Sequence, residues 1–210
     1  MRARKIYFII LLLGLISVPA FAHEPYIETD DYSEEAPFII KDSIENSKAI
    51  YAWLDNGTDI DVYTFEVKKP ARLYAKVIVQ ACPELKDHLP WIALAGPGLP
   101  MPDEALPFTL PQGYGAYIIK NKNPGEQRET FYEAFSAKSY YDGPLFDQEV
   151  TAEGTWYAYF WDPQQKGGDY VAIFGFKERF ALKHLWGSIV NTIRVRHNKE
   201  LHVPCKSKRT

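Results

Sequence analysis

Four acidic or amide side chains lie close together in the stretch DNGTDID, residues 55–61. Hard cations such as Ca²⁺ prefer several oxygen ligands, and closely spaced carboxylates in a turn can supply them. One interpretation is therefore a calcium site that uses Asp59 and Asp61. The other is a solvated turn whose side chains bond to its own backbone. The stretch is not an EF-hand, because Ile60 stands where that motif requires glycine.

A histidine follows directly on the small-x-small triplet AFA, residues 20–22. A cut after Ala22 would make His23 the amino terminus, where its amine and its ring could bind copper together. His88, in the loop KDHLPW, is the partner that such a copper site would use. The alternative is that His23 is simply the residue that follows a cleavage site.

Aromatic residues crowd the stretch TWYAYFW, residues 155–161. Successive side chains of a strand point to opposite faces. The face expected to enter the core carries Trp156, Ala158 and Phe160. The opposite face carries a set that we call the aromatic stripe: Tyr157, Tyr159 and Trp161. We expect the stripe to lie beside Val171 and Ile173 of the next strand. Such a stripe can stack on sugar rings or extended peptide, or the C-terminal helix can pack over it.

The hydrophobic period changes after Phe176. Apolar residues then recur at helical spacing, at Leu182, Leu185, Trp186, Ile189 and Ile193. This spacing predicts an amphipathic helix. We favour packing of its apolar side on the body of the protein. The pattern ends after Asn198, which predicts a mobile tail.

Charge is divided unevenly along the chain. Residues 177–210 carry nine Lys or Arg against two acidic residues, a net of +7, whereas residues 23–176 carry a net of −13. An acidic body repels nucleic acid, so no nucleic-acid partner is expected. A basic amphipathic helix can also rest on an anionic membrane surface. The residues expected to make that weak contact are Lys183, Trp186, Arg194 and Arg196.

The amino-terminal segment has the features of an export signal. A basic start, an apolar run over residues 6–16 and small residues at 20–22 predict a signal peptide over residues 1–22. The apolar run is too short to remain as a membrane span, which takes ~20 residues. We expect an exported protein, periplasmic or secreted. Because that compartment is oxidising, Cys82 and Cys205 are candidates for a disulfide.

Short β-prone runs dominate the middle of the chain. We expect one hairpin from residues 48–54 and 61–67 and another from 155–161 and 169–176, each around a turn rich in Asp, Gly or Pro. With about eight such runs and no helix before Arg179, the pattern predicts an all-β, antiparallel β-sandwich, jelly-roll or immunoglobulin-like, with a C-terminal amphipathic helix.

The predicted organisation has four parts. Residues 1–22 form the signal peptide and residues 23–47 an acidic N-terminal arm or edge strand. The β-sandwich covers residues 48–176, and residues 177–210 form the basic helix and tail. Within the sandwich, a Pro- and Gly-rich stretch at residues 96–115 is expected to be a long surface loop.

Two stretches resemble a known family. DIDVYTFEVKKPARLYAKV, residues 59–77, is similar to the signature D-x-D-x-Y-x-F-x-V, then Ala-x-Leu, of bacterial pre-peptidase C-terminal-like domains. EGTWYAYFWDPQQKGGDYVAIF, residues 153–174, looks like their closing hairpin. The resemblance implies a sandwich of secreted proteins that serves as an accessory binding module, and some relatives of this fold bind calcium at loop carboxylates. A longer middle region and a basic helix set this chain apart.

Signatures of common enzymes are absent from the sequence, which has no G-x-S-x-G, no H-E-x-x-H and no phosphate-cradling glycine loop. We therefore expect no enzyme, but an exported binding or accessory module that recognises an envelope protein, peptide or glycan through the aromatic stripe and the loop 96–115. One alternative is a metal-binding protein with calcium or copper. Another is a peripheral membrane protein held by the C-terminal helix.

Overall fold

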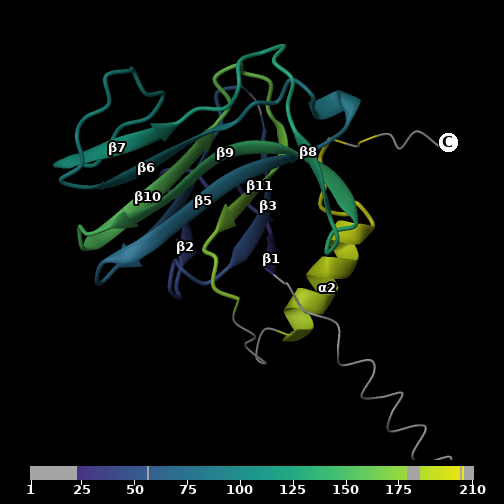
Figure 1. The fold of residues 1–210 in the computed structure, drawn as a ribbon, viewed down its shortest axis with the longest axis horizontal. Coiled ribbons are helices and arrows are strands. Elements are labelled where there is room, and N and C mark those ends of the chain that lie inside the picture. The colour runs from purple at the N-terminus through teal and green to yellow at the C-terminus, as the bar shows by residue number, and fades with distance from the viewer. Residues whose placement is uncertain (1–22, 56, 179–184, 204, 206–210) are drawn as a thin grey trace, which may run out of the picture.

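The computed structural model describes residues 23–55, 57–178, 185–203 and 205, which form two stacked β-sheets with a helix at one end (Figure 1). The predicted signal peptide lies outside the described residues. In spatial order, the six-stranded sheet consists of β1 (Glu24–Ile27), β3 (Lys48–Leu54), β11 (Gly168–Phe174), β5 (Ala71–Gln80), β9 (Lys138–Val150) and β8 (Thr130–Glu133). The five-stranded sheet consists of β2 (Phe38–Ile40), β4 (Ile60–Val67), β10 (Gly154–Trp161), β6 (Trp91–Pro97) and β7 (Tyr114–Ile119). The helical elements are η1 (Pro83–Leu85) and α2 (Leu185–Arg196).

The predicted all-β sandwich with a C-terminal helix is confirmed. Its strand pairs are antiparallel, as predicted, except that β1 runs parallel to β3 and β2 runs parallel to β4. Both of these strands come from the acidic arm, residues 23–47, so the arm supplies an edge strand to each sheet. No helix in the described part of the chain is long and apolar enough to cross a bilayer.

The prediction of two hairpins is wrong, because the two strands of each expected pair lie in different sheets. β3 belongs to the six-stranded sheet and β4 to the five-stranded sheet, and β11 and β10 are divided in the same way. Turns rich in Asp, Gly and Pro can join neighbours in one sheet or cross from one sheet to the other. The alternation of apolar side chains is the same in both cases. The local pattern therefore predicts strands and turns without assigning each strand to a sheet.

The main core lies between the two sheets. Trp156, Ala158 and Phe160 face this core, as predicted, and are fully buried. The Trp156 indole N–H donates a hydrogen bond to the Ala152 carbonyl at 3.1 Å. A side chain at Gly96 of β6 would place its Cβ 2.5 Å from the Trp156 ring. Glycine at this position therefore makes room for the indole.

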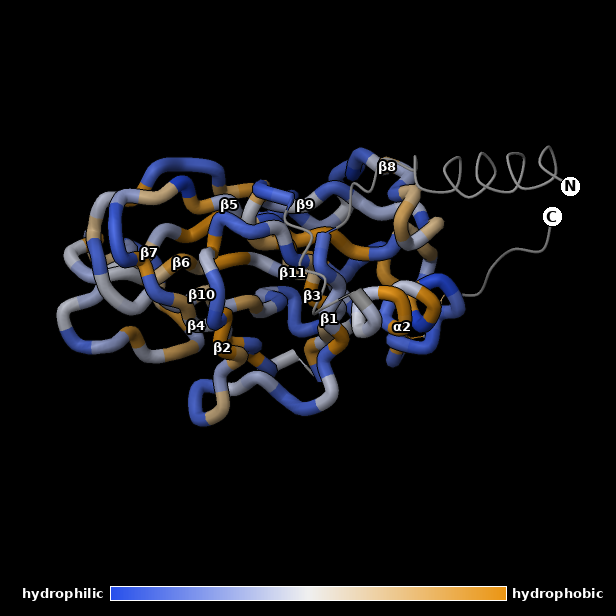
Figure 2. Tube along the Cα trace, turned by 90° about the horizontal axis from the view of Figure 1, so that it is seen from below, coloured by the Kyte–Doolittle hydropathy of each residue, from blue (hydrophilic) through white to orange (hydrophobic). Residues whose placement is uncertain are grey.

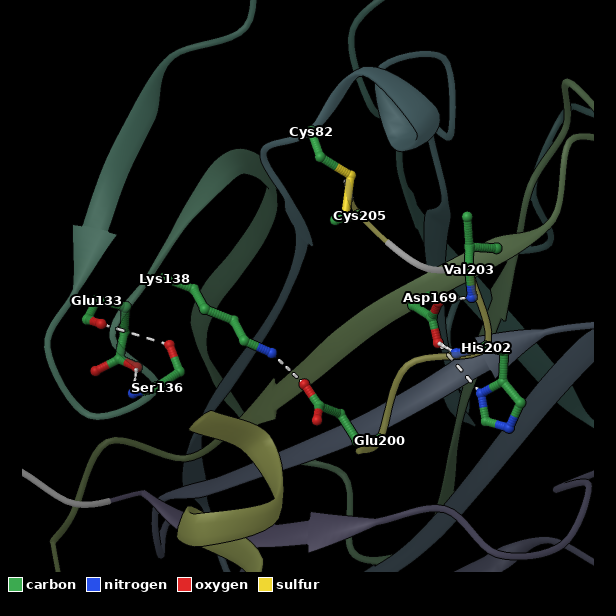
Figure 3. Close-up of polar contacts among 9 residues, drawn as sticks. All are labelled: Cys82, Glu133, Ser136, Lys138, Asp169, Glu200, His202, Val203 and Cys205. Carbon is green, nitrogen blue, oxygen red and sulfur yellow. Dashed lines mark hydrogen bonds and ion pairs between the residues drawn. A yellow bond between two sulfur atoms is a disulfide. The ribbon is translucent and has the colours of Figure 1, made fainter. Parts of the chain in front are cut away.

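The tail that follows α2 was expected to be mobile, but residues 199–203 are fastened to the six-stranded sheet (Figure 3). Cys205 forms a disulfide with Cys82, with the two Cα atoms 5.7 Å apart. Asp169 of β11 accepts hydrogen bonds from the backbone N–H of His202 at 2.8 Å and of Val203 at 2.6 Å. The disulfide predicted from the oxidising compartment is therefore present.

Two side-chain contacts add to this attachment. Glu200 forms a buried ion pair with Lys138 at the start of β9 (Figure 3). The His202 ring stacks on Trp53 of β3, with the ring centroids 3.7 Å apart. The tail thus contacts three strands of one sheet, which explains its order despite the loss of sequence pattern.

Replacing Cys82 and Cys205 together by serine is expected to lower the free energy of unfolding by up to roughly 4 to 5 kcal/mol, because the bridge closes a loop of this length in the unfolded chain. The two cysteines are 123 residues apart in the sequence. Urea denaturation with and without a reducing agent measures the effect. Reduced wild type is the matched control and should behave like the double variant. An unchanged midpoint in both would contradict a stabilising role for the bridge.

Candidate metal centre

Asp61 is a carboxylate inside the sandwich. It lies on β4 in the same parity as Tyr63 and Phe65, which face the core, so its side chain also points inward. The residue is 0% exposed. Its Oδ2 accepts a hydrogen bond of 2.6 Å from the Tyr170 hydroxyl, which lies 2.9 Å from the Tyr63 hydroxyl. This contact joins the two sheets, because Tyr170 belongs to β11 and Asp61 to β4.

Glu28 comes directly after β1 and is only 4% exposed. Its backbone N–H donates to the Tyr51 carbonyl at 2.9 Å, which continues the pairing of β1 with β3. Tyr26, two residues earlier, packs against the core, and Glu28 points to the same side because side chains alternate. Glu28 Oε2 accepts a hydrogen bond of 3.0 Å from the Trp53 N–H.

Glu28 and Asp61 each keep one oxygen that is buried without a donor in the described structure, Glu28 Oε1 and Asp61 Oδ1. The two carboxyl groups are close enough to hydrogen-bond to each other when one of them carries a proton. Burial raises the pKa of both groups, and nearby carboxylates add to the increase. The pair therefore needs a shared proton or a bound cation.

Two further carboxylates complete the group. Asp59 directly precedes β4, and its Oδ2 accepts a hydrogen bond from the Asp55 N–H at 2.6 Å and its Oδ1 from the Ile60 N–H at 2.8 Å. Asp31 comes from the arm and is exposed, and its pKa is raised by partial burial and by Asp59 and Asp55. We call the four residues the carboxylate cluster: Glu28, Asp31, Asp59 and Asp61.

The carboxylate cluster has dimensions that suit a calcium ion. Asp31, Asp59 and Asp61 each present an oxygen within 4.8 Å of the others. Two oxygens on opposite sides of one Ca²⁺ are separated by about 4.6 to 5.2 Å, twice the usual Ca–O distance. The orphaned oxygens of Glu28 and Asp61 are acceptors without donors, which is what a hard cation requires. A second group, Cys82, Glu84 and Cys205, is ruled out because the disulfide uses both sulfur atoms.

Sequence reasoning named Asp59 and Asp61 but missed Glu28 and Asp31. Their contact with β4 spans about thirty residues of chain, and no local spacing encodes such a contact. One signal was present. An acidic residue two positions beyond Tyr26, in a segment recognised as an edge strand, would share the inward face of that strand.

The structure does not bring together the predicted copper pair. His23 shares a hydrogen bond with Ser47 and precedes the end of β1 that pairs with Lys48. His88 lies beside Gly168, which pairs with Leu54 at the other end of β3. Six residues of strand, about 20 Å, separate these two ends. The prediction that His23 and His88 together form a copper site is therefore wrong.

His88 has a structural environment instead. Its Nδ1 lies 2.9 Å from Oδ2 of Asp162, and both side chains are buried. Asp162 also accepts from the Gln164 N–H at 2.8 Å, and Arg128 donates to the His88 carbonyl at 3.1 Å. These contacts tie the loop before β6 to the end of β10.

The aromatic stripe lies on the outer face of the five-stranded sheet, but it is not an open surface. Tyr159 and Trp161 are buried and Tyr157 is half-buried. Phe108, from the Pro- and Gly-rich loop, stacks on Tyr159 with ring centroids 4.0 Å apart and meets Trp161 edge-on at 5.4 Å. The cover is thus the loop, and the prediction that the C-terminal helix covers the stripe is wrong.

The predicted neighbours of the stripe are also wrong. Val171 and Ile173 lie on the outer face of the other sheet, because β11 and β10 belong to different sheets. That second face carries α2, whose Val195 packs among these residues. The sandwich therefore has a different cover on each outer face.

We predicted that the apolar side of the C-terminal helix packs on the body of the protein. This prediction is wrong for every one of its apolar residues whose side chain is described. Trp186, Ile189 and Ile193 are exposed instead of facing the body. Lys183, one of the predicted membrane contacts, lies outside the described residues. Arg194 is half-exposed, and Arg196 is exposed while its Nε donates to the Phe135 carbonyl at 2.7 Å.

No protein-family model and no curated protein matches this chain. Among solved structures, PliG of Salmonella Typhimurium, a periplasmic lysozyme inhibitor of g-type lysozyme, is 14% identical with a TM-score of 0.35, over 67% of this chain and 98% of that one. The pre-peptidase C-terminal domain of a Bacillus anthracis collagenase is 13% identical with a TM-score of 0.35, over 67% and 93%. This second structure is of the class that the two strand motifs resemble. The all-β sandwich class rests on the strands of this chain itself.

Without divalent cations, the free energy of unfolding is expected to fall as the pH rises above the ordinary carboxylate pKa values of 4.5 for Glu28 and 3.8 for Asp61. Because burial raises the pKa of both groups in the folded protein, the stabilising proton is fully bound below the unfolded pKa and is lost as the pH rises through the folded pKa. Urea denaturation at pH 5, 7 and 9 with a chelator measures the slope.

The variant Glu28→Gln sharpens this test, because a neutral amide replaces the protonated acid. We expect a shallower pH dependence than in wild type and greater stability than wild type at pH 9. Asp30→Asn, which removes one charge from the same segment outside the carboxylate cluster, is the matched control and should keep the wild-type slope. Parallel pH profiles for all three proteins would show that the buried pair holds no proton.

Proposed function

We propose that this protein is an exported, non-enzymatic binding module whose N-terminal arm is fastened to the sandwich by a calcium ion at the carboxylate cluster. The observation that supports this most is the pair of buried oxygens, Glu28 Oε1 and Asp61 Oδ1, which have no donor in the described structure. Asp61 also presents an oxygen within 4.8 Å of oxygens of Asp31 and Asp59. A cation would supply the positive charge that these buried acceptors need.

The donor set favours calcium over other ions. The three carboxylates that lie within 4.8 Å of one another, Asp31, Asp59 and Asp61, all offer oxygen, and this group contains neither histidine nor cysteine. Such a donor set is poorly suited to copper and zinc. Magnesium demands small octahedral sites and keeps several waters. Calcium accepts irregular carboxylate sets, and the exposed Asp31 gives the ion a path from solvent.

A bound ion would act on the arm. Glu28 and Asp31 belong to the segment between β1 and β2, whereas Asp59 directly precedes β4 and Asp61 is its second residue. Because β1 and β2 are the edge strands of different sheets, an ion at this point would hold both edges in register with their neighbours. Its role would be structural, by neutralising like charges that otherwise repel.

The partner class predicted from the sequence, an envelope protein, peptide or glycan, remains part of this proposal. The aromatic stripe does not provide the contact, because the loop covers it. The outer side of that loop, where Met101 is 69% exposed, is the surface that would meet such a partner.

Calcium is expected to bind with measurable heat and to raise the unfolding midpoint as its concentration increases, because a ligand specific for the folded state stabilises it by mass action, by about 2.7 kcal/mol at 100 times Kd. Isothermal titration with Ca²⁺ and thermal unfolding in calcium against chelator measure both effects. Glu28→Gln and Asp31→Asn should each weaken binding at least tenfold.

Asp30→Asn is again the matched control, since it removes the same charge from the neighbouring position and should keep wild-type affinity. Equal loss in Asp31→Asn and Asp30→Asn would point to general attraction of cations by the acidic arm. The absence of heat and of any midpoint shift at millimolar calcium would overturn the proposal.

A further inference from the structure

α2 lies at the end of the sandwich opposite β7 (Figures 1 and 2) and packs on the six-stranded sheet through one side. Val195 is 0% exposed and packs with Tyr51, Val171 and neighbouring residues of the six-stranded sheet. The Asn191 amide donates to the Pro25 carbonyl of β1 at 2.9 Å. Ser188 and Thr192, on the same side of the helix, are half-buried.

The opposite side of α2 is apolar and open to solvent. Trp186 is 76% exposed, Ile193 53%, Ile189 42% and Val190 41%. These positions fall at i, i+3, i+4 and i+7, so they form one continuous stripe, which we call the outer apolar face. With 3.6 residues per turn, Val195 lies about 180° around the helix from Trp186.

This orientation is the reverse of the usual one. A surface helix of a soluble protein normally turns its apolar stripe to the core and its polar side to water. Among the helix side chains that the structure describes, small polar residues and Val195 face the sheet, while four large apolar side chains face outward. Figure 2 shows α2, which includes orange apolar stretches, at one end of the molecule. A contiguous exposed patch of this kind marks an interaction surface.

Positive charge borders the outer apolar face. Arg194 and Arg196 lie roughly 80° to either side of Trp186 around the helix axis, and Lys199 follows the helix end. Residues 185–199 contain no acidic residue. The next acid, Glu200, is buried in its ion pair with Lys138 and does not offset these charges.

We propose that the outer apolar face of α2 rests on the surface of an anionic lipid bilayer. Trp186 and the aliphatic side chains enter the boundary between headgroups and acyl chains, and Arg194 and Lys199 reach the lipid phosphates. Arg196 adds its charge from the border while it donates to the carbonyls of Phe135 and Ala134. A second copy of the chain is a poorer occupant, since two such faces would bring their basic borders together and repel each other.

The test is co-sedimentation of protein recovered after export, with its amino terminus verified by mass spectrometry, with two kinds of vesicle. One is phosphatidylcholine with a quarter phosphatidylglycerol, and the other is phosphatidylcholine alone. A chelator is present throughout, so that calcium cannot bridge acidic side chains to lipid. Wild type should bind the anionic vesicles at low salt, bind them much less at high salt, and bind neutral vesicles weakly.

Ile193→Ser and Trp186→Ala are each expected to weaken binding to anionic vesicles about tenfold, which corresponds to about 1.4 kcal/mol from loss of buried apolar surface. Both residues are exposed, so circular dichroism should show an unchanged fold. Ile39→Ser is the matched control for Ile193→Ser, because Ile39 is 58% exposed and lies on β2 of the five-stranded sheet, whereas α2 packs on the six-stranded sheet; it should bind like wild type.

Glu28→Gln should also bind vesicles like wild type, so failure of the calcium site and failure of the membrane contact are distinguishable. Absence of wild-type binding to anionic vesicles at low salt would overturn the inference. So would equal binding by wild type and both helix variants. A concentration-dependent dimer that Ile193→Ser abolishes, without any vesicle binding, would assign the face to a second copy instead.

Discussion

The carboxyl groups of Glu28 and Asp61 are buried inside the sandwich, and the contacts at this end of the molecule depend on how their charge is compensated. An uncompensated buried charge costs on the order of several kcal/mol. Compensation comes from distant parts of the chain, with an N–H from Trp53 on β3 and a hydroxyl from Tyr170 on β11. A proton or a cation must supply the rest. The arm, β4 and β11 therefore meet at one place, where the charge of two buried carboxyl groups must be compensated.

Each outer face of the sandwich has its own cover. The loop between β6 and β7 seals the five-stranded sheet by laying Phe108 on Tyr159. The six-stranded sheet receives α2 through Val195, and the tail beyond it is closed by the disulfide to Cys82. Because the arm adds β1 to that same sheet, the first described residues and the tail both attach to the six-stranded sheet.

Periodicity was enough to predict the elements and their inward faces. The core positions of β10 and the inward parity of β4, including Asp61, follow from alternation alone. The assignment of strands to sheets does not, because a turn that crosses between sheets has the same composition as a hairpin turn. The cluster was half predicted, since Asp59 and Asp61 are neighbours in sequence whereas Glu28 meets them only in the fold. The helix was predicted correctly, but its orientation was not. Apolar spacing shows that one side of a helix is apolar, but it does not show whether that side faces the protein core or another partner.

α2 and the loop at residues 98–113 lie at opposite ends of the molecule (Figure 1). The helix lies at one end, and β7 with its loop lies at the other (Figure 1). Whatever surface meets α2 leaves the loop pointing away from it, separated by the length of the sandwich. If α2 rests on a bilayer and a partner binds at the loop, as proposed above, the sandwich would keep that partner at a fixed height above the bilayer.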